Sequence, residues 1–157
     1  MQDLTYVRTG QGWLYLALVM DLWSRKIVGW AMADHLRSAL VVTALQRAQT
    51  QHQPGQGLLV RSDRGGQYAS QETCAFLAGH GWTASLSRPG NPYDNACMES
   101  ASGKLKGEAL GAEVPADHAA ARARLFAGIE CWYNQRRRHS ALGYKSPVAF
   151  EAQFMNT

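Results

Sequence analysis

Apolar residues follow two different periods along this chain, and the change between them separates predicted strands from predicted helices. Three β-type runs come first, at residues 3–8, 13–21 and 27–32. The second run is almost continuously apolar, which is typical of a strand covered on both faces. The glycine-containing turn at 9–12 suits a hairpin connection. We therefore expect three consecutive antiparallel strands.

Apolar residues recur at helical spacing after position 38, in segments that alternate with two further predicted strands. It predicts a helix over 39–51 with Ser38 as its N-cap, and a second over 71–79 capped by Ser70. A third helix should start near Asn95, and Asp117 should cap a long last helix reaching about Asn134. Strands are predicted at 57–61 and 82–86.

This order of elements defines an α/β fold. Right-handed β-α-β crossovers after an antiparallel meander give one five-stranded mixed sheet, three strands antiparallel and then two parallel, with helices on both faces. In that arrangement the first and fourth strands can be neighbours.

Composition narrows the class of protein. The 157 residues suit a single domain, and 16 Lys and Arg against 12 Asp and Glu give a net charge of +4, which permits a phosphate-bearing partner without indicating one. The three cysteines are not clustered, which argues against a disulfide framework or a zinc site and favours a reducing, cytoplasmic compartment. No apolar stretch reaches the roughly 18 residues expected of a membrane-spanning helix.

Three acidic residues occupy unusual positions on separate elements. Asp63 directly follows the apolar run 58–60, Glu99 follows a turn rich in Asn, Pro and Tyr, and Asp3 lies on the first strand. Neighbouring first and fourth strands would bring Asp3 and Asp63 together, and the helix bearing Glu99 needs only to pack across that end. Carboxylates of this kind suit Mg²⁺ or Mn²⁺, and phosphodiester chemistry commonly uses two such ions.

Each acid alone has an ordinary explanation as a turn or capping residue. Asp21, which follows an apolar strand, is of that ordinary kind, and we expect it to pair locally with Arg25 in a turn. The three acids become specific only as a set.

Basic residues near the acids are candidates for phosphate contact. Lys106 lies seven residues, close to two helical turns, after Glu99 and therefore on the same helix face. Lys104 and the run Arg136, Arg137, Arg138 and His139 are further candidates for DNA binding, although a short basic run is more commonly solvated surface. His139 could contact a phosphate or the third carboxylate, or be a hydrogen-bonded structural histidine.

Several motifs together resemble the catalytic core of transposases and retroviral integrases, and most closely a large bacterial insertion-sequence family. The motifs are Asp3-Leu4-Thr5-Tyr6-Val7, Ser62-Asp63-Arg64-Gly65-Gly66-Gln67-Tyr68, Asn91-Pro92-Tyr93-Asp94-Asn95 with Glu99-Ser100, and Tyr133-Asn134 followed by Arg137-Arg138-His139-Ser140 and Leu142-Gly143-Tyr144. The resemblance covers nearly the whole chain and implies a ribonuclease H-like fold.

The resemblance also implies a function. Asp3, Asp63 and Glu99 would be the metal ligands for two Mg²⁺ or Mn²⁺ ions, and Lys106 would be the family's basic residue seven positions after the glutamate. Such a core would cleave phosphodiesters at element ends and join the freed 3′-hydroxyls to target DNA, acting as a homo-oligomer in the bacterial cytoplasm. Two alternatives stay open: a ribonuclease H-like nuclease or resolvase that only hydrolyses, and a catalytically silent DNA-binding module.

The sequence departs from the family pattern in two places. It begins two residues before Asp3, so we expect the family's upstream DNA-binding region to be absent, leaving residues 1–157 as a core with a basic segment at 136–150 and Asp3 near a frayed end. Ala101-Ser102-Gly103 stands where the family usually has a pair of large apolar residues. We expect these small residues to reduce exposed hydrophobic surface.

Overall fold

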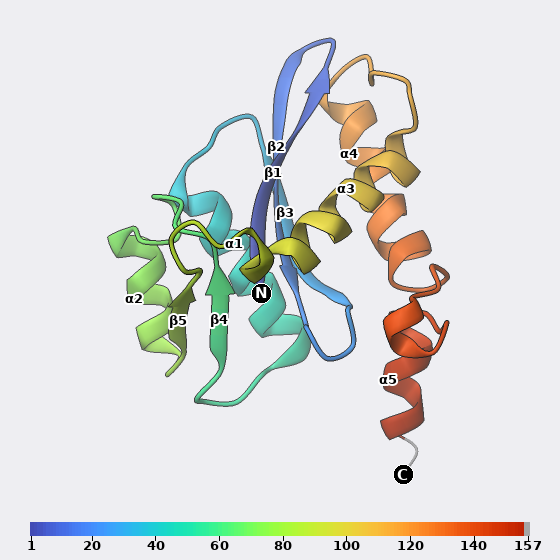
Figure 1. Ribbon diagram of the computed structural model, residues 1–157. Coiled ribbons are helices and arrows are strands. Elements are labelled where there is room, and N and C mark those ends of the chain that lie inside the picture. Colours follow the sequence, from blue (N-terminus) through green and yellow to red (C-terminus); the bar gives the residue numbers. More distant parts are fainter. Residues whose placement is uncertain (156–157) are drawn as a thin grey trace.

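Three antiparallel strands form the centre of the fold, as predicted. The computed structural model describes residues 1–155, and its first strands are β1 (Gln2–Thr9), β2 (Gly12–Met20) and β3 (Ile27–Ala33) (Figure 1). In their register Asp3 lies opposite Leu18 and Thr5 opposite Leu16. The start of β1 is not frayed, because the Met1 amine donates to the Met20 carbonyl at 2.8 Å and the Met1 carbonyl accepts from the Met20 amide at 2.7 Å.

The prediction of one continuous five-stranded sheet is wrong. Strands β4 (Leu59–Ser62) and β5 (Thr83–Leu86) pair in parallel as a separate two-stranded sheet, although β4 lies beside β1. A four-residue strand offers few ladder positions, and both ends of β4 are tied to β5: the Thr83 amide donates to Leu58 and the Ser87 amide to Ser62. The neighbour relation of β1 and β4, which positions the candidate site, is nevertheless present.

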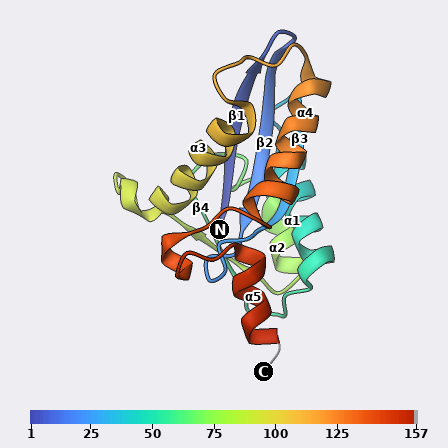
Figure 2. The ribbon, with the colours of Figure 1, turned by 90° about the vertical axis from the view of Figure 1, so that its right-hand side faces the viewer.

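Helices cover both faces of the antiparallel sheet, and β2 supplies side chains to both cores through its alternation. Helix α1 (Ser38–His52) packs with Ala17 and Val19, together with α2 (Gln71–Gly79). On the other face, α3 (Ala96–Leu110) and α4 (His118–Ala127) pack with Leu16 and Leu18 (Figures 1 and 2). None of the helices within residues 1–155 combines the length and apolar character needed to cross a bilayer.

Two of the three predicted caps are confirmed. Ser70 accepts a hydrogen bond from the Thr73 amide at 3.2 Å, and Asp117 accepts from the Ala120 amide at 2.7 Å. Ser38 is not a cap: it is the first residue of α1, and Arg37 occupies the capping position without a side-chain bond.

The C-terminal third contains more structure than the sequence pattern predicts. The helix that starts as α4 continues as wider turns, η2 (Gly128–Tyr133), so the predicted end near Asn134 is confirmed. A short turn, η3 (Ser140–Leu142), and a further helix, α5 (Pro147–Met155), were not predicted (Figure 2). Ser146 caps α5 by accepting from the Ala149 amide at 3.3 Å, and the Ser-Pro pair at its start is the signal that could have identified it.

Candidate active site and nucleic-acid interface

Asp3 and Thr5 project from one face of β1 onto α3. The Ser102 hydroxyl donates to Asp3 Oδ2 at 2.8 Å, and the Lys106 ammonium donates to Thr5 Oγ1 at 2.8 Å. The contacts follow from two periodicities, since strand residues two apart and helix residues four apart each share a face. Helix α3 is thereby held along the first strand by polar contacts that include the first candidate ligand.

Asp63 lies just beyond β4, where its Oδ1 accepts from the Gly65 amide at 2.7 Å. Tyr68, which sequence reasoning left out of the site, is 3% exposed, and its hydroxyl has no hydrogen-bond partner within the described residues. Burial raises the pKa of this hydroxyl above its usual range, and the charges of Asp3 and Asp63 raise it further. Both carboxylates therefore lie close enough to Tyr68 to act on it.

Glu99 is exposed in the first turn of α3, three residues before Ser102 and so toward the same side of the helix. Its amide donates to the Asn95 carbonyl at 3.0 Å. Within residues 1–155 no three His, Cys, Asp or Glu side chains are gathered closely enough to hold a metal ion. Among the described residues the three carboxylates are therefore not assembled into a metal site, and the role of Glu99 as third ligand stays a prediction.

The donor chemistry of this region fits a hard divalent cation. The hydrogen bonds of Asp3 and Asp63 each occupy one carboxylate oxygen, and the unpartnered Tyr68 hydroxyl adds a buried polar group beside them. Oxygen ligands of this kind are those that Mg²⁺ and Mn²⁺ take.

Two of the three small residues after Ser100, Ala101 and Ser102, do not lie on the surface, whereas Gly103 is exposed. Ala101 and Ser102 are 8% and 4% exposed, so the expectation that they reduce exposed hydrophobic surface is wrong. Their small size instead lets α3 approach β1 closely enough for Ser102 to reach Asp3.

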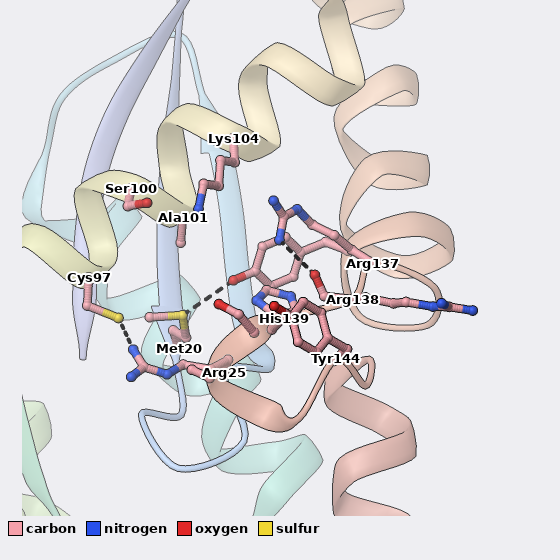
Figure 3. Close-up of a pocket in the computed structure, with 13 residues that line it drawn as sticks. Met20, Arg25, Cys97, Ser100, Ala101, Lys104, Arg137, Arg138, His139 and Tyr144 are labelled. Carbon is pink, nitrogen blue, oxygen red and sulfur yellow. Dashed lines mark hydrogen bonds between the residues drawn. The ribbon is translucent and has the colours of Figure 1, made fainter.

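A basic pocket lies next to α3, between the turn after β2 and the segment from Tyr133 to Tyr144 (Figure 3). Its volume is about 490 Å³. Four predicted DNA-binding residues line it: Lys104, Arg137, Arg138 and His139. Lys106 is not among them, since it lies against β1 with its ammonium 5.7 Å from the centre of the Tyr6 ring, and Arg136 also lies outside the lining.

Two further lining residues, Arg25 and Tyr144, were missed by sequence reasoning. The predicted pairing of Arg25 with Asp21 is wrong: Asp21 accepts from the amide and hydroxyl of Ser24 at 3.1 and 2.8 Å, while Arg25 donates to the Cys97 sulfur (Figure 3). The left-handed backbone of Arg25, with φ at 61°, accompanies this placement in the pocket.

Not every basic side chain of this pocket is available to a ligand. Arg137 donates from Nε to both oxygens of Glu108, at 3.0 and 2.9 Å. Burial, followed by the charges of Arg137, Lys104 and Arg25, lowers the pKa of His139 to about 4, so this ring is neutral at pH 7. Its ring contacts Tyr133 edge-on at 5.0 Å between centroids, but its buried Nε2 has no hydrogen-bond partner within residues 1–155, so the expectation of a hydrogen-bonded structural histidine is not met. Positive charge in the pocket therefore comes mainly from Arg25, Lys104 and Arg138.

The fold is that of an integrase catalytic core. The simian T-cell lymphotropic virus intasome contains a chain that matches 95% of this one with a TM-score of 0.74 and 19% identity, over 52% of its own length. The HTLV-2 integrase catalytic core domain in complex with magnesium matches 95% of this chain and 92% of its own, with a TM-score of 0.69 and 18% identity.

Sequence similarity agrees with the fold. Sequence models described as integrase core domain match residues 2–92 and 80–147, and the chain belongs to the integrase core domain family. It is 45% identical over 149 residues to the transposase InsF for insertion sequence IS3A of Escherichia coli K12, covering 95% of this chain and 52% of that protein. It is 44% identical over 149 residues to the transposase for insertion sequence element IS904 of Lactococcus lactis, covering 95% of this chain and 59% of that protein. The chain thus spans about half the length of these relatives.

Proposed function

We propose that this chain is the catalytic core of a DNA transposase, with Asp3, Asp63 and Glu99 as ligands of two Mg²⁺ or Mn²⁺ ions. The observation that carries the proposal is that Asp3 and Asp63 come from the neighbouring elements β1 and β4, and that both charges act on the buried Tyr68 hydroxyl, in a chain of the integrase core family. When bound, the two ions would activate the attacking oxygen and stabilise the leaving oxygen of a phosphodiester.

The side chains of the chain itself would do the positioning. Ser102 holds one oxygen of Asp3, and the Gly65 amide holds one oxygen of Asp63, which fixes both carboxylates before any ligand arrives. Glu99 lies on the exposed side of α3 and can adjust its longer side chain toward them. The Lys106 ammonium is bonded to Thr5, which lies two residues after Asp3 on β1. From this position Lys106 would contact a phosphate of the bound DNA.

The proposed reaction has two parts. The core would cleave element-end DNA and join the freed 3′-hydroxyl to target DNA, within a homo-oligomer. A nuclease or resolvase would show cleavage only, and a silent DNA-binding module would show neither.

Manganese binding and DNA chemistry test the proposal separately. We expect calorimetric titration to show Mn²⁺ binding that disappears in Asp63→Asn, and Mn²⁺-dependent plasmid nicking and oligonucleotide joining that disappear in Asp3→Asn, Asp63→Asn and Glu99→Gln. Asp34→Asn, at an exposed acid of the loop after β3, is the matched control and should behave as wild type. Full activity in any of the three site variants would remove that residue from the site.

A further inference from the structure

Helix α3 separates the acidic site from the basic pocket. Its exposed face between them, which we call the crest, includes two glycines and therefore presents few side chains. Glu99, Ser102 and Lys106 face the β1 side, whereas Cys97 and Lys104 line the pocket. At about 3.6 residues per turn, Gly103 and Gly107 fall between these two rows. A side chain at either glycine would meet open space, so nothing projects from the crest at these two positions. A polymer backbone could lie close against the helix there.

The pocket contains two strained residues. Only three non-glycine residues within 1–155 have a left-handed backbone, and two of them, Arg25 and Tyr144, line this pocket with φ at 61° in both. Such conformations persist where the surrounding structure imposes them and cluster at ligand-binding sites. Tyr144 is 71% exposed and lines the pocket (Figure 3).

The lining chemistry is that of a site for one nucleotide. None of the lining residues is acidic, and Arg25, Lys104 and Arg138 provide positive charge beside the hydroxyls of Ser100 and Ser140. The volume, about 490 Å³, falls within the range of small-molecule sites. A free phosphate would use the cations alone, but an exposed tyrosine ring offers a surface on which a base can stack.

We propose that this pocket binds one nucleotide of a DNA strand that crosses the crest of α3 from the acidic site, with its phosphate held by Arg25 and Lys104 and its base against Tyr144. The proposal rests on the proposed function insofar as DNA is the substrate. Arg138 adds a further positive charge to the lining of the pocket. The neutral ring of His139, which also lines the pocket, packs against Tyr133. The strand would thus be anchored at a point separate from Lys106.

Fluorescence anisotropy with a short labelled single-stranded DNA tests this site. EDTA keeps metal binding by the acids out of the measurement. We expect Lys104→Gln and Arg25→Gln each to weaken binding about tenfold, as for a lost charged hydrogen bond. Each should also reduce the slope of log affinity against log salt by about 0.7, the value for one phosphate contact on a single strand. Lys145→Gln removes the same charge from the same basic segment at an exposed position outside the pocket, and it should keep both affinity and slope close to wild type.

Tyr144→Gly tests the base contact, because glycine keeps the left-handed backbone while removing the ring. We expect it to weaken binding about fivefold or more without changing the salt slope. Inorganic phosphate should displace the DNA only at much higher concentration than unlabelled oligonucleotide. Competition at equal concentration would make this a free-anion site and overturn the proposal, as would unchanged binding in Tyr144→Gly.

The outcomes separate this site from the catalytic proposal. Equal effects of Lys145→Gln and Lys104→Gln would show that only general surface charge matters and would overturn the pocket proposal, whatever the nicking assay shows. Asp63→Asn should bind DNA in EDTA at least as tightly as wild type. If wild type fails to nick or join DNA while the pocket variants still lose binding, the catalytic proposal fails and the nucleotide site stands.

Discussion

Asn134 should be among the most sensitive single positions for stability, because its carboxamide joins η2 to the first residue of β3. The side-chain nitrogen donates to the Ile27 carbonyl at 2.9 Å, and the side-chain oxygen accepts from the Ile27 amide at 2.9 Å. Both residues are 3% exposed. Replacement by alanine therefore leaves one buried donor and one buried acceptor without partners.

The expected loss of folding stability follows from the cost of leaving these two buried polar groups without hydrogen-bond partners. Each unsatisfied buried group costs about 1–3 kcal/mol, which gives about 2–6 kcal/mol for the pair. Since the vacated space can admit water, we expect a decrease of about 3 kcal/mol in the free energy of unfolding for Asn134→Ala. In a chain of this length that corresponds to a fall in Tm of roughly 6–12 °C.

The same substitution should weaken DNA binding at the basic pocket. Ile27 follows the turn that carries Arg25, and Asn134 precedes the segment that carries Arg138, so the Asn134 side chain ties two walls of the pocket together. Thermal unfolding followed by circular dichroism measures the stability, and anisotropy with labelled DNA measures the binding. Gln135→Ala, at the exposed neighbouring position, is the control. A fall in Tm no larger than that of Gln135→Ala would refute the reasoning.

Three further substitutions are expected to alter stability in measurable ways. A Cβ at Gly29 would lie 2.3 Å from the Ala44 carbonyl oxygen and 2.8 Å from the Ala48 amide, so Gly29→Ala should force β3 and α1 apart and cost about 3 kcal/mol in urea unfolding. Gly103→Ala, which meets nothing within 4 Å, should instead stabilise by up to about 1 kcal/mol; equal stability of the two variants would contradict the close packing. His139 has a folded pKa of about 4 against an ordinary 6.5, so the unfolded chain takes up its proton more readily and stability should fall as pH drops through this window. Because this ring is partly exposed and solvent screens it, the part due to His139 is about 1 kcal/mol between pH 6.5 and 5, and His139→Gln should remove it; identical pH slopes of the urea midpoint in both proteins would count against it.

Local sequence signals predicted most of the elements because each depends on neighbouring residues. Alternating and continuous apolar runs identified all three antiparallel strands, and Ser70 and Asp117 identified two helix starts. Ser38 failed as a cap because the helix begins one residue earlier than the pattern suggests. The division into two sheets was not predictable, since it depends on whether β1 and β4 form ladder bonds, which apolar periodicity does not report.

The candidate site was predictable in its acids and less so in their surroundings. Asp3 and Asp63 could be placed together because the strand order makes β1 and β4 neighbours. Tyr68 was not predicted as a site residue, because its place there depends on the burial of a hydroxyl without a hydrogen-bond partner, which the sequence does not show. Arg25 and Tyr144 were not predicted for a related reason. They are 119 positions apart in the sequence, and they line one pocket only because Asn134 joins the two segments that carry them.

The placement of opposite charges on opposite sides of α3 has a consequence for binding. Carboxylates beside β1 would repel DNA phosphates until cations neutralise them, whereas the pocket attracts phosphate without any metal. Salt screens exposed charges at physiological ionic strength, which weakens the influence of each side on the other. The pocket could then hold a strand before the divalent ions arrive, and loss of an acid would abolish chemistry while leaving that hold intact. Asp63→Asn should therefore keep DNA binding and lose cleavage, whereas Lys104→Gln should weaken DNA binding while the acids stay intact. The effects of the two substitutions on binding should add when they are combined.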